Sequence, residues 1–194
     1  LQIQLELLRE VLDTPDFCAA MQIVLSHPHE MLSFAPEPIS SDQQIRWKPA
    51  ELGSITKGFP RREVPESHPI RKRTGLKTLP QKVAVQKKFR NVDTPENRFV
   101  KYALWELRAF LSHANAVFES CRGWDSSASL SRRLSDSLGE WLGRGFFKEI
   151  GEMRLAPLGS PVLQRKAGYR EILRWWLRFR TASELSWEGG ENLF

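Results

Sequence analysis

The sequence of 194 residues has only two cysteines, Cys18 and Cys121, and no long apolar run. Two distant cysteines do not make a structural zinc site, and the four histidines, at positions 27, 29, 68 and 113, do not complete one. Because each cysteine falls on the apolar side of an expected helix, we expect buried, reduced thiols in a cytoplasmic protein. No segment is long enough to span a membrane and no signal peptide is evident, so we expect no membrane association.

Sequence motifs of catalysis are also missing. The sequence has no phosphate-binding loop, no Gly-x-Ser-x-Gly, no His-Glu-x-x-His and no dinucleotide fingerprint. A nuclease of the restriction-enzyme fold needs a metal-binding Asp and a Glu-x-Lys, and no Glu-x-Lys occurs. Asp93 and Glu96 are better explained as caps of a helix. We therefore expect no catalytic residue, no metal and no cofactor, and a chain that is not itself an enzyme.

Positive charge is concentrated in one segment of the chain. Between Lys57 and Arg90 there are eleven basic and two acidic residues, whereas the remainder has 18 basic and 21 acidic ones. Such a track suits phosphate backbones, although a solvated basic loop, or one packed on the acidic remainder, is an equal alternative. No aromatic residues interleave as a single-strand binder needs. The candidate DNA-binding residues are Arg61, Arg62, Arg71, Lys72, Arg73, Lys77, Lys82, Lys87, Lys88 and Arg90.

Proline dominates the segment from His29 to Pro80. Eight prolines between positions 28 and 80 exclude a long helix or a central strand. A disordered linker would carry fewer apolar residues than this segment, which contains Phe34, Ile45, Trp47, Leu52, Ile55 and Phe59. We expect an irregular layer that lies on a helical core.

Two hydrophobic periods meet between Lys82 and Cys121. Val83, Val85 and Phe89 alternate with polar residues, which predicts a short strand. After Asp93 the apolar spacing changes to three and four, which predicts a long helix over residues 94–120. Asp93 or Thr94 is the expected N-cap, Pro95 fits the first turn, and Glu96 suggests a capping box. We expect Phe99, Leu107 and Phe110 to be core residues.

Further helices are expected on both sides of the long one. The spacing predicts helices over 1–12, from Pro15 to about Ser26, from a cap at Ser126 or Ser127, and over 168–181, with a strand-like extension in 184–194. The predicted fold is α+β and helix-dominated: a long central helix packed with four or five others, a short strand and the Pro-rich layer. We expect one domain over 1–194, with a helical pair (1–28), an irregular basic part (29–92), a helical core (93–182) and the start of a linker (183–194).

Two polar groups on these helices are candidate partner-binding residues. Arg170, Arg174 and Arg178 recur every four residues and would meet phosphate or an acidic partner helix, although a solvated helix face is the commoner explanation. Asn97, Arg98 and Lys101, at the start of the long helix, serve either packing or an interface.

The segment Asp93-Thr94-Pro95-Glu96-Asn97-Arg98-Phe99-Val100-Lys101 resembles the signature of McrC-like restriction subunits. Ser160 to Arg165, followed by Gly168 to Arg174, resembles the second recurring block of that family. Helical spacing is already under way at Leu1, so we expect a piece of a longer protein.

The resemblance implies a place in a modification-dependent restriction system that defends against phage. McrC-like subunits act with McrB-like AAA+ GTPases, and a PD-(D/E)xK nuclease domain follows this region in the parent chain. For this chain the resemblance implies a non-catalytic adaptor that docks on the AAA+ partner and helps to position DNA. The alternative is a stand-alone DNA-binding module that uses the basic segment 57–90.

Overall fold

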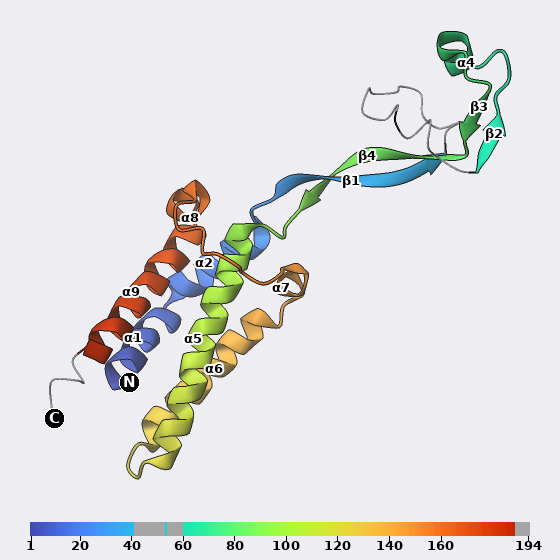
Figure 1. Ribbon diagram of the computed structural model, residues 1–194. Helices are drawn as coiled ribbons and strands as arrows, with labels where there is room; N and C mark the ends of the chain where they lie inside the picture. The colour runs from blue at the N-terminus through green and yellow to red at the C-terminus, as the bar shows by residue number, and fades with distance from the viewer. Residues whose placement is uncertain (41–52, 54–59, 189–194) are drawn as a thin grey trace. The chain divides into compact units, whose positions relative to one another are not determined.

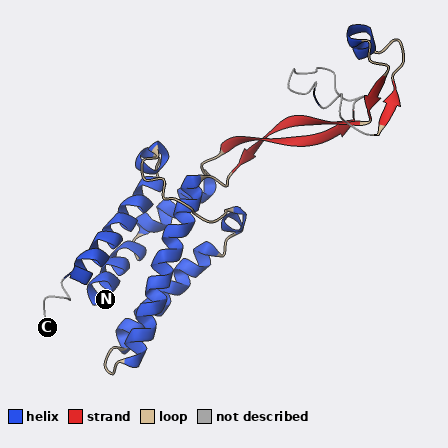
Figure 2. Cartoon of the chain, viewed as in Figure 1, coloured by secondary structure: helices blue, strands red, loops and turns tan. Residues whose placement is uncertain are grey.

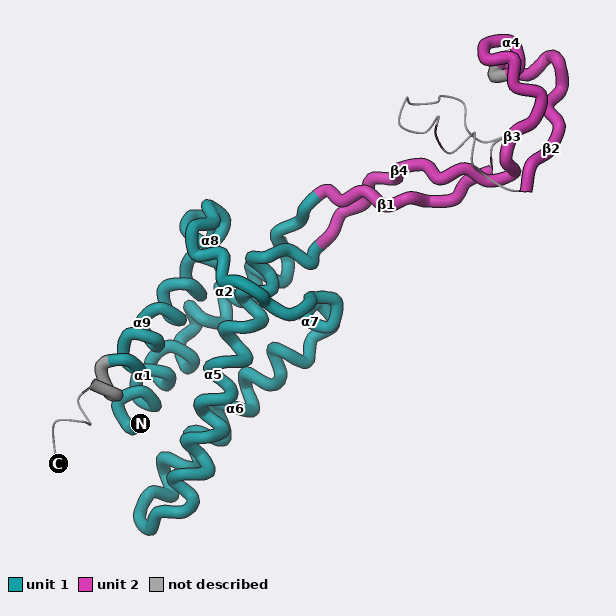
Figure 3. Tube along the Cα trace, in the orientation of Figure 1, with its two compact units in different colours: residues 1–31, 92–194 teal, residues 32–91 magenta. Residues whose placement is uncertain are grey.

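The computed structural model describes residues 1–40, 53 and 60–188, and these belong to two compact units (Figure 3). Unit 1 comprises Leu1–Met31 and Val92–Phe194, and unit 2 comprises Leu32–Asn91. Five apolar residues expected in the Pro-rich layer lie outside the described residues: Ile45, Trp47, Leu52, Ile55 and Phe59.

The described part of unit 1 is built from helices (Figures 1 and 2). They are α1 (Gln2–Leu12), α2 (Pro15–Ser26), α5 (Pro95–Ser120), α6 (Asp125–Leu142), α7 (Gly145–Glu149), α8 (Pro161–Arg165) and α9 (Tyr169–Glu188). Helix α5 packs along α6, and α9 lies against α1, α2 and α5. Together with the strands of unit 2, this arrangement confirms the predicted helix-dominated α+β fold.

Helix α5 forms where the sequence predicts it, because Thr94 and Pro95 define its start. The Thr94 hydroxyl accepts a hydrogen bond from the Asn97 N–H at 3.3 Å, and Pro95 occupies a position whose N–H would have no helical partner. The expected capping box is wrong, since the Glu96 carboxylate accepts from Ser160 Oγ instead. Phe99 and Leu107 are buried, whereas Phe110 is only partly buried against Phe179.

Two other helix boundaries differ from the sequence prediction. Helix α6 begins at Asp125 after Trp124, which makes no side-chain cap, rather than after Ser126 or Ser127. Helix α9 continues to Glu188, so the strand-like extension expected from Glu184 is wrong as far as the structure describes it, and residues 189–194 lie outside it.

The expectation of buried cysteines is wrong. Cys18 and Cys121 are both free thiols on the surface. In α2 the buried side chains are Phe17, Ala20, Met21 and Val24, which places Cys18 on the outer side of that stripe. Cys121 follows the last residue of α5 and lies beyond its packed face.

Unit 2 contains more regular structure than its prolines predict. It has β1 (Met31–Ser40), β2 (Arg61–Glu63), α4 (Pro69–Thr74), β3 (Thr78–Pro80) and β4 (Lys82–Asn91). Strand β1 carries Pro36 and Pro38, and among the described strands it pairs with β4 in a two-stranded sheet. Because such a strand has one unpaired edge, proline nitrogens can face that edge without breaking the ladder. The alternating burial of β4 confirms the strand predicted around Val83 and Val85.

A second small sheet provides the core of unit 2. Strands β2 and β3 are antiparallel, with Arg62 opposite Leu79. Val64, Leu79 and Val83 form its buried cluster, with Ile39 and Leu76 packed beside them. Within the described residues of unit 2 this cluster is small, so polar contacts contribute a large share of the order there.

Candidate functional site

Asn97, in the motif at the start of α5, is fully buried and connects separate parts of unit 1. Its amide nitrogen donates to the carbonyl oxygens of His29 at 2.9 Å and Val92 at 2.6 Å. Its amide oxygen accepts from the hydroxyl of Tyr169. The side chain therefore satisfies backbone groups at the two points where the chain leaves and re-enters unit 1 around residues 32–91.

Tyr169 and Lys166 also hydrogen-bond to the backbone around His29. The Tyr169 hydroxyl accepts from the His29 N–H at 2.7 Å, and Lys166 Nζ donates to the His27 carbonyl at 2.8 Å. Burial raises the pKa of Tyr169 to about 12, so the phenol keeps its proton and remains a donor to Asn97. Gly168, at φ +84°, precedes Tyr169, and a Cβ there would lie 2.8 Å from the Ala20 carbonyl oxygen.

The charged residues of the motif also have partners inside unit 1. Asp93 accepts two bonds from the Arg98 guanidinium, at 2.7 and 2.6 Å, and one from the Gly151 N–H at 2.9 Å. The Arg98 guanidinium, and after it the Gly151 N–H, hold the pKa of Asp93 below its usual value. Lys101 Nζ donates to the Ile150 carbonyl. These contacts tie α5 to the segment that follows α7.

The two sequence blocks that carry the resemblance therefore meet in space. Ser160 Oγ donates to Glu96 at 2.6 Å, and Tyr169 donates to Asn97, although each pair is more than sixty residues apart. The structure gives Asn97, Arg98 and Lys101 internal contacts, which is the packing role that sequence reasoning left open. Contact of these three residues with a partner stays a prediction, and Asn97 has no exposed surface to offer one.

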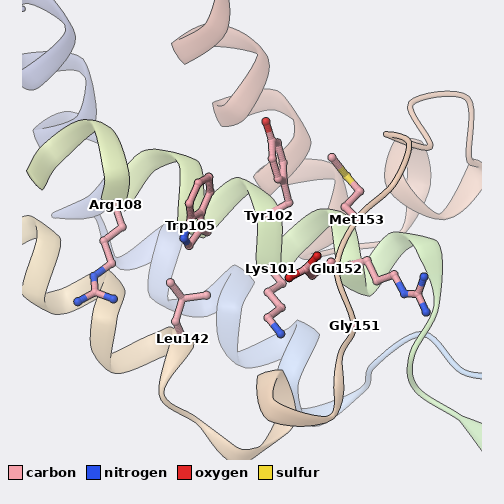
Figure 4. Close-up of a pocket in the computed structure, with 9 residues that line it drawn as sticks. Lys101, Tyr102, Trp105, Arg108, Leu142, Gly151, Glu152 and Met153 are labelled. Carbon is pink, nitrogen blue, oxygen red and sulfur yellow. The ribbon is translucent and has the colours of Figure 1, made fainter. Parts of the chain in front are cut away.

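A pocket of about 540 Å³ lies beside this junction on the outer face of α5 (Figure 4). Helix α5 supplies side chains at helical spacing, and α6 and the segment after α7 supply the rest. Its lining residues are Arg98, Lys101, Tyr102, Trp105, Arg108, Leu142, Gly151, Glu152 and Met153.

The largest side chain that lines this α5 pocket is that of Trp105, which is 59% exposed. Tyr102 lies beside it, with ring centroids 6.4 Å apart, and burial followed by the charge of Glu106 raises the pKa of the Tyr102 phenol. The Arg108 guanidinium packs over Gly139, where an added Cβ would lie 3.2 Å from it. Gly139 thus gives Arg108 room to lie flat on α6 at the edge of the pocket.

Sequence reasoning missed this pocket. Trp105 falls outside the apolar stripe of Phe99, Leu107 and Phe110, so a large aromatic residue on the polar face of α5 was the available signal. Leu142 and Met153 come from distant segments, and no local pattern places them beside α5.

Several candidate DNA-binding residues of unit 2 have internal partners. Arg71 donates to the Val64 carbonyl at 2.8 Å and pairs with Glu66 at 2.9 Å, and Arg61 donates to both oxygens of Thr78. Lys87 pairs with Glu37 at 2.8 Å, and Lys88 lies over the Phe34 ring. Arg62 and Arg90 make further interactions. Arg71 and Arg61 therefore support the small fold of unit 2.

The remaining cations of this set point to solvent. Lys72 and Arg73 on α4, Lys77 before β3, and Lys82 at the start of β4 are exposed. Within the described ranges, their side chains have no hydrogen bond or ion pair. Among the described residues of unit 2, these four are exposed cations that an anionic ligand could reach.

The arginine row of α9 is only partly engaged. Arg170 pairs with Glu171 at 2.6 Å. Arg174 and Arg178 are exposed and line a shallow groove of about 400 Å³ with Ile23 and Trp175. The row lies on the surface as predicted from its spacing, while its contact with a partner remains a prediction.

In the part of the chain that the structure describes, no helix is long and apolar enough to cross a membrane. Residues 1–40, 53 and 60–188 also contain no group of three or more His, Cys, Asp or Glu side chains placed to hold a metal ion.

Comparison with known proteins gives one family. No curated protein and no solved structure matches the chain. A family described as a domain of unknown function, DUF2357, matches residues 3–176. This range includes α5, its pocket, both sequence blocks that meet at Asn97, and unit 2. The chain belongs to the DUF2357 family.

Proposed function

We propose that this chain is a non-catalytic adaptor in which unit 1 docks on a protein partner and unit 2 holds DNA. The partner is an AAA+ GTPase of the McrB-like kind, as the resemblance of the two sequence blocks implies. The DNA is delivered to a nuclease domain of the PD-(D/E)xK class that would follow in the parent chain.

The α5 pocket carries the docking half of the proposal. Protein interfaces are enriched in tryptophan, tyrosine, methionine and arginine, and their strongest contacts cluster on such residues. Trp105, Tyr102, Met153 and Arg108 supply all four residue types around one hollow. An exposed tryptophan beside a pocket gains binding energy when a partner covers it, because its large apolar ring then leaves water.

The hydrogen bonds made by the motif at the start of α5 support an adaptor role rather than a catalytic one. The carboxylate of Asp93 is used by Arg98 and the Gly151 N–H, and that of Glu96 accepts from Ser160. These acids hold the start of α5 in place. These contacts fix the first turns of α5, whose side chains also line the α5 pocket.

The exposed cations of unit 2 support the DNA half. Lys72 and Arg73 lie on α4, Lys77 precedes β3 and Lys82 begins β4, and none of them has an acidic partner within the described residues. Cations of this kind bind phosphates and carry little sequence information. The DNA contact is therefore expected to be tolerant of sequence and sensitive to salt.

Replacing Trp105 with alanine tests the docking site. We expect Trp105→Ala to weaken binding to the McrB-like GTPase by about 30-fold or more, the loss typical of a hot-spot residue, as measured by calorimetry. The melting temperature should stay close to that of the wild type, because the side chain is largely exposed.

Trp124→Ala is the matched control. Trp124 is also at the surface of unit 1, 37% exposed and stacked on Phe118, away from the lining of the α5 pocket. We expect this variant to bind the GTPase within about twofold of wild type, as a residue outside a hot spot does. Equal binding losses for the two variants would show that the α5 pocket is not the docking site.

A further inference from the structure

The ribbon formed by β1 and β4 has two chemically different faces. Successive side chains of a strand point to opposite faces, so odd-numbered and even-numbered residues separate. Three observations fix which residues share a face. Glu37 pairs with Lys87, Lys88 lies over Phe34, and Ile39 packs against the cluster that contains Val83. Odd-numbered residues of both strands therefore form one face and even-numbered residues form the other.

The even-numbered face of the ribbon has no acidic side chain. Strand β1 contributes Leu32, Phe34, Pro36, Pro38 and Ser40, and β4 contributes Lys82, Ala84, Gln86, Lys88 and Arg90. Glu37 is the acid of these two strands, and it lies on the odd-numbered face, paired with Lys87. The even-numbered face therefore combines three cations with an apolar and aromatic surface.

Phe34 is the aromatic residue of this face, and its ring is 58% exposed. Lys88 Nζ lies 5.7 Å from the ring centroid, so a cation and an open aromatic surface stand side by side. A nucleotide offers the complementary pair, a negatively charged phosphate and a planar base. Leu32, 65% exposed on the same face, adds apolar surface beside the ring.

We propose that the even-numbered face of the ribbon binds single-stranded nucleic acid. A base stacks on Phe34, and phosphates of the same strand contact Lys82, Lys88 and Arg90. The inference rests on the proposed function that unit 2 holds DNA, and it specifies the form of the ligand. It also adds a residue, Phe34, that the basic segment 57–90 does not contain.

The exposed ring favours a single strand over a duplex. In a duplex the bases stack on each other, so a side chain reaches a base face only by forcing two base pairs apart. In a single strand every base has an accessible face, and stacking on an aromatic residue tolerates any sequence. Cations alone would serve both forms, whereas Phe34 contributes only where a base is unstacked.

This arrangement could not be predicted from the sequence because Phe34 and Lys88 lie far apart in the chain. Within the basic segment itself, the aromatic residue of β4 is Phe89, which lies on the odd-numbered face, away from Lys88 and Arg90. Pairing of β1 with β4 brings Phe34 to the cations, so the expectation that aromatic residues do not interleave is corrected for the ribbon.

The test uses fluorescence anisotropy with a labelled 20-nucleotide thymidine strand and a 20-base-pair duplex. We expect the whole chain to bind the single strand more tightly than the duplex. Phe34→Ala should weaken single-strand binding by about 5- to 100-fold, the range for loss of one stacked base, and leave duplex binding within about twofold. Phe34→Trp should keep or strengthen single-strand binding.

Phe89→Ala is the matched control. Phe89 lies on the odd-numbered face of the same ribbon and is 45% exposed, so its removal changes a similar ring on the wrong face. We expect single-strand binding within about twofold of wild type. Replacing Lys82 and Lys88 with glutamine should reduce the slope of log affinity against log salt by about 1.4, since each single-strand phosphate contributes about 0.7.

Four outcomes overturn the proposal. Equal losses for Phe34→Ala and Phe89→Ala, or duplex binding at least as tight as single-strand binding, would leave unit 2 as a DNA holder but without this face. Loss of GTPase binding in Phe34→Ala, with unchanged nucleic-acid affinity, would make the face a protein contact. A wild-type chain that binds neither nucleic acid would also contradict the DNA half of the proposed function, while the docking half stands on its own measurement.

Discussion

Replacing Asn97 with alanine is expected to lower the free energy of unfolding of unit 1 by about 3–6 kcal/mol. The change removes the partner of three groups: the part-buried carbonyl oxygens of His29 and Val92, and the buried hydroxyl of Tyr169. An orphaned buried polar group costs about 1–3 kcal/mol, and alanine supplies no replacement donor or acceptor. Urea denaturation followed by tryptophan fluorescence measures the difference.

Gln164→Ala is the control for Asn97→Ala. Its amide also donates to one backbone carbonyl, that of Leu158, but at an exposed position where water replaces the bond. We expect a cost below about 1 kcal/mol. Tyr169→Phe, which removes only the hydroxyl, should fall between the two and serves if Asn97→Ala does not fold. Similar losses of unfolding free energy for Asn97→Ala and Gln164→Ala would contradict the structural role assigned to Asn97.

Replacing Phe99 with alanine is expected to cost about 3–5 kcal/mol of folding stability. The side chain has no exposed surface and meets Trp176 edge to face, with ring centroids 5.3 Å apart. Its removal loses the burial of a large ring and leaves a cavity in a well-packed core. Chemical denaturation of the variant measures this loss directly. Phe99→Leu should recover more than half of the stability that Phe99→Ala loses.

Phe110→Ala provides the comparison on the same helix. Phe110 is partly buried and packs edge to face on Phe179, at 5.1 Å between centroids. Because the ring remains partly in water in the folded state, we expect about half the loss seen for Phe99→Ala. A larger loss for Phe110 than for Phe99 would show that the packing of α5 is assigned wrongly.

The sequence alone predicted the elements whose signals are local. The start of α5 follows from Thr94 and Pro95, and its length follows from apolar spacing that continues for seven turns. The alternation of Val83 and Val85 predicted β4 for the same reason. In each case the physical cause, a cap or a buried face, lies within a few residues of the element.

Features that depend on contacts between distant segments could not be predicted from the sequence and required the structure. Strand β1 could not be predicted across Pro36 and Pro38, because its hydrogen bonds come from β4, more than forty residues away. The roles of Asn97 depend on His29 and Tyr169, which no spacing rule places beside it. Cys18 shows a finer limit, since one step around α2 separates a buried from an exposed position.

The basic segment illustrates the same limit for function. Its charge is visible in the sequence, but only the contacts show that Arg71 holds the Val64 carbonyl while Lys72 and Arg73 face solvent. A triple replacement of Arg71, Lys72 and Arg73 would therefore disturb unit 2 as well as remove charge. A variant designed to test DNA binding should therefore keep Arg71 unchanged.

The roles proposed for the two units can be tested by measuring two variants in two assays. One variant replaces Trp105 and Arg108 with alanine, and the other replaces Lys72, Arg73 and Lys77. GTP hydrolysis by the McrB-like partner and DNA affinity as a function of salt are measured for both.

We predict that the first variant loses stimulation of hydrolysis and keeps its DNA affinity. The second keeps stimulation, and its salt slope on duplex DNA falls by up to about 2.7, or about 0.9 for each phosphate that is no longer neutralised. Loss of both activities in one variant, or of neither in both, would contradict an adaptor with separate protein and DNA surfaces.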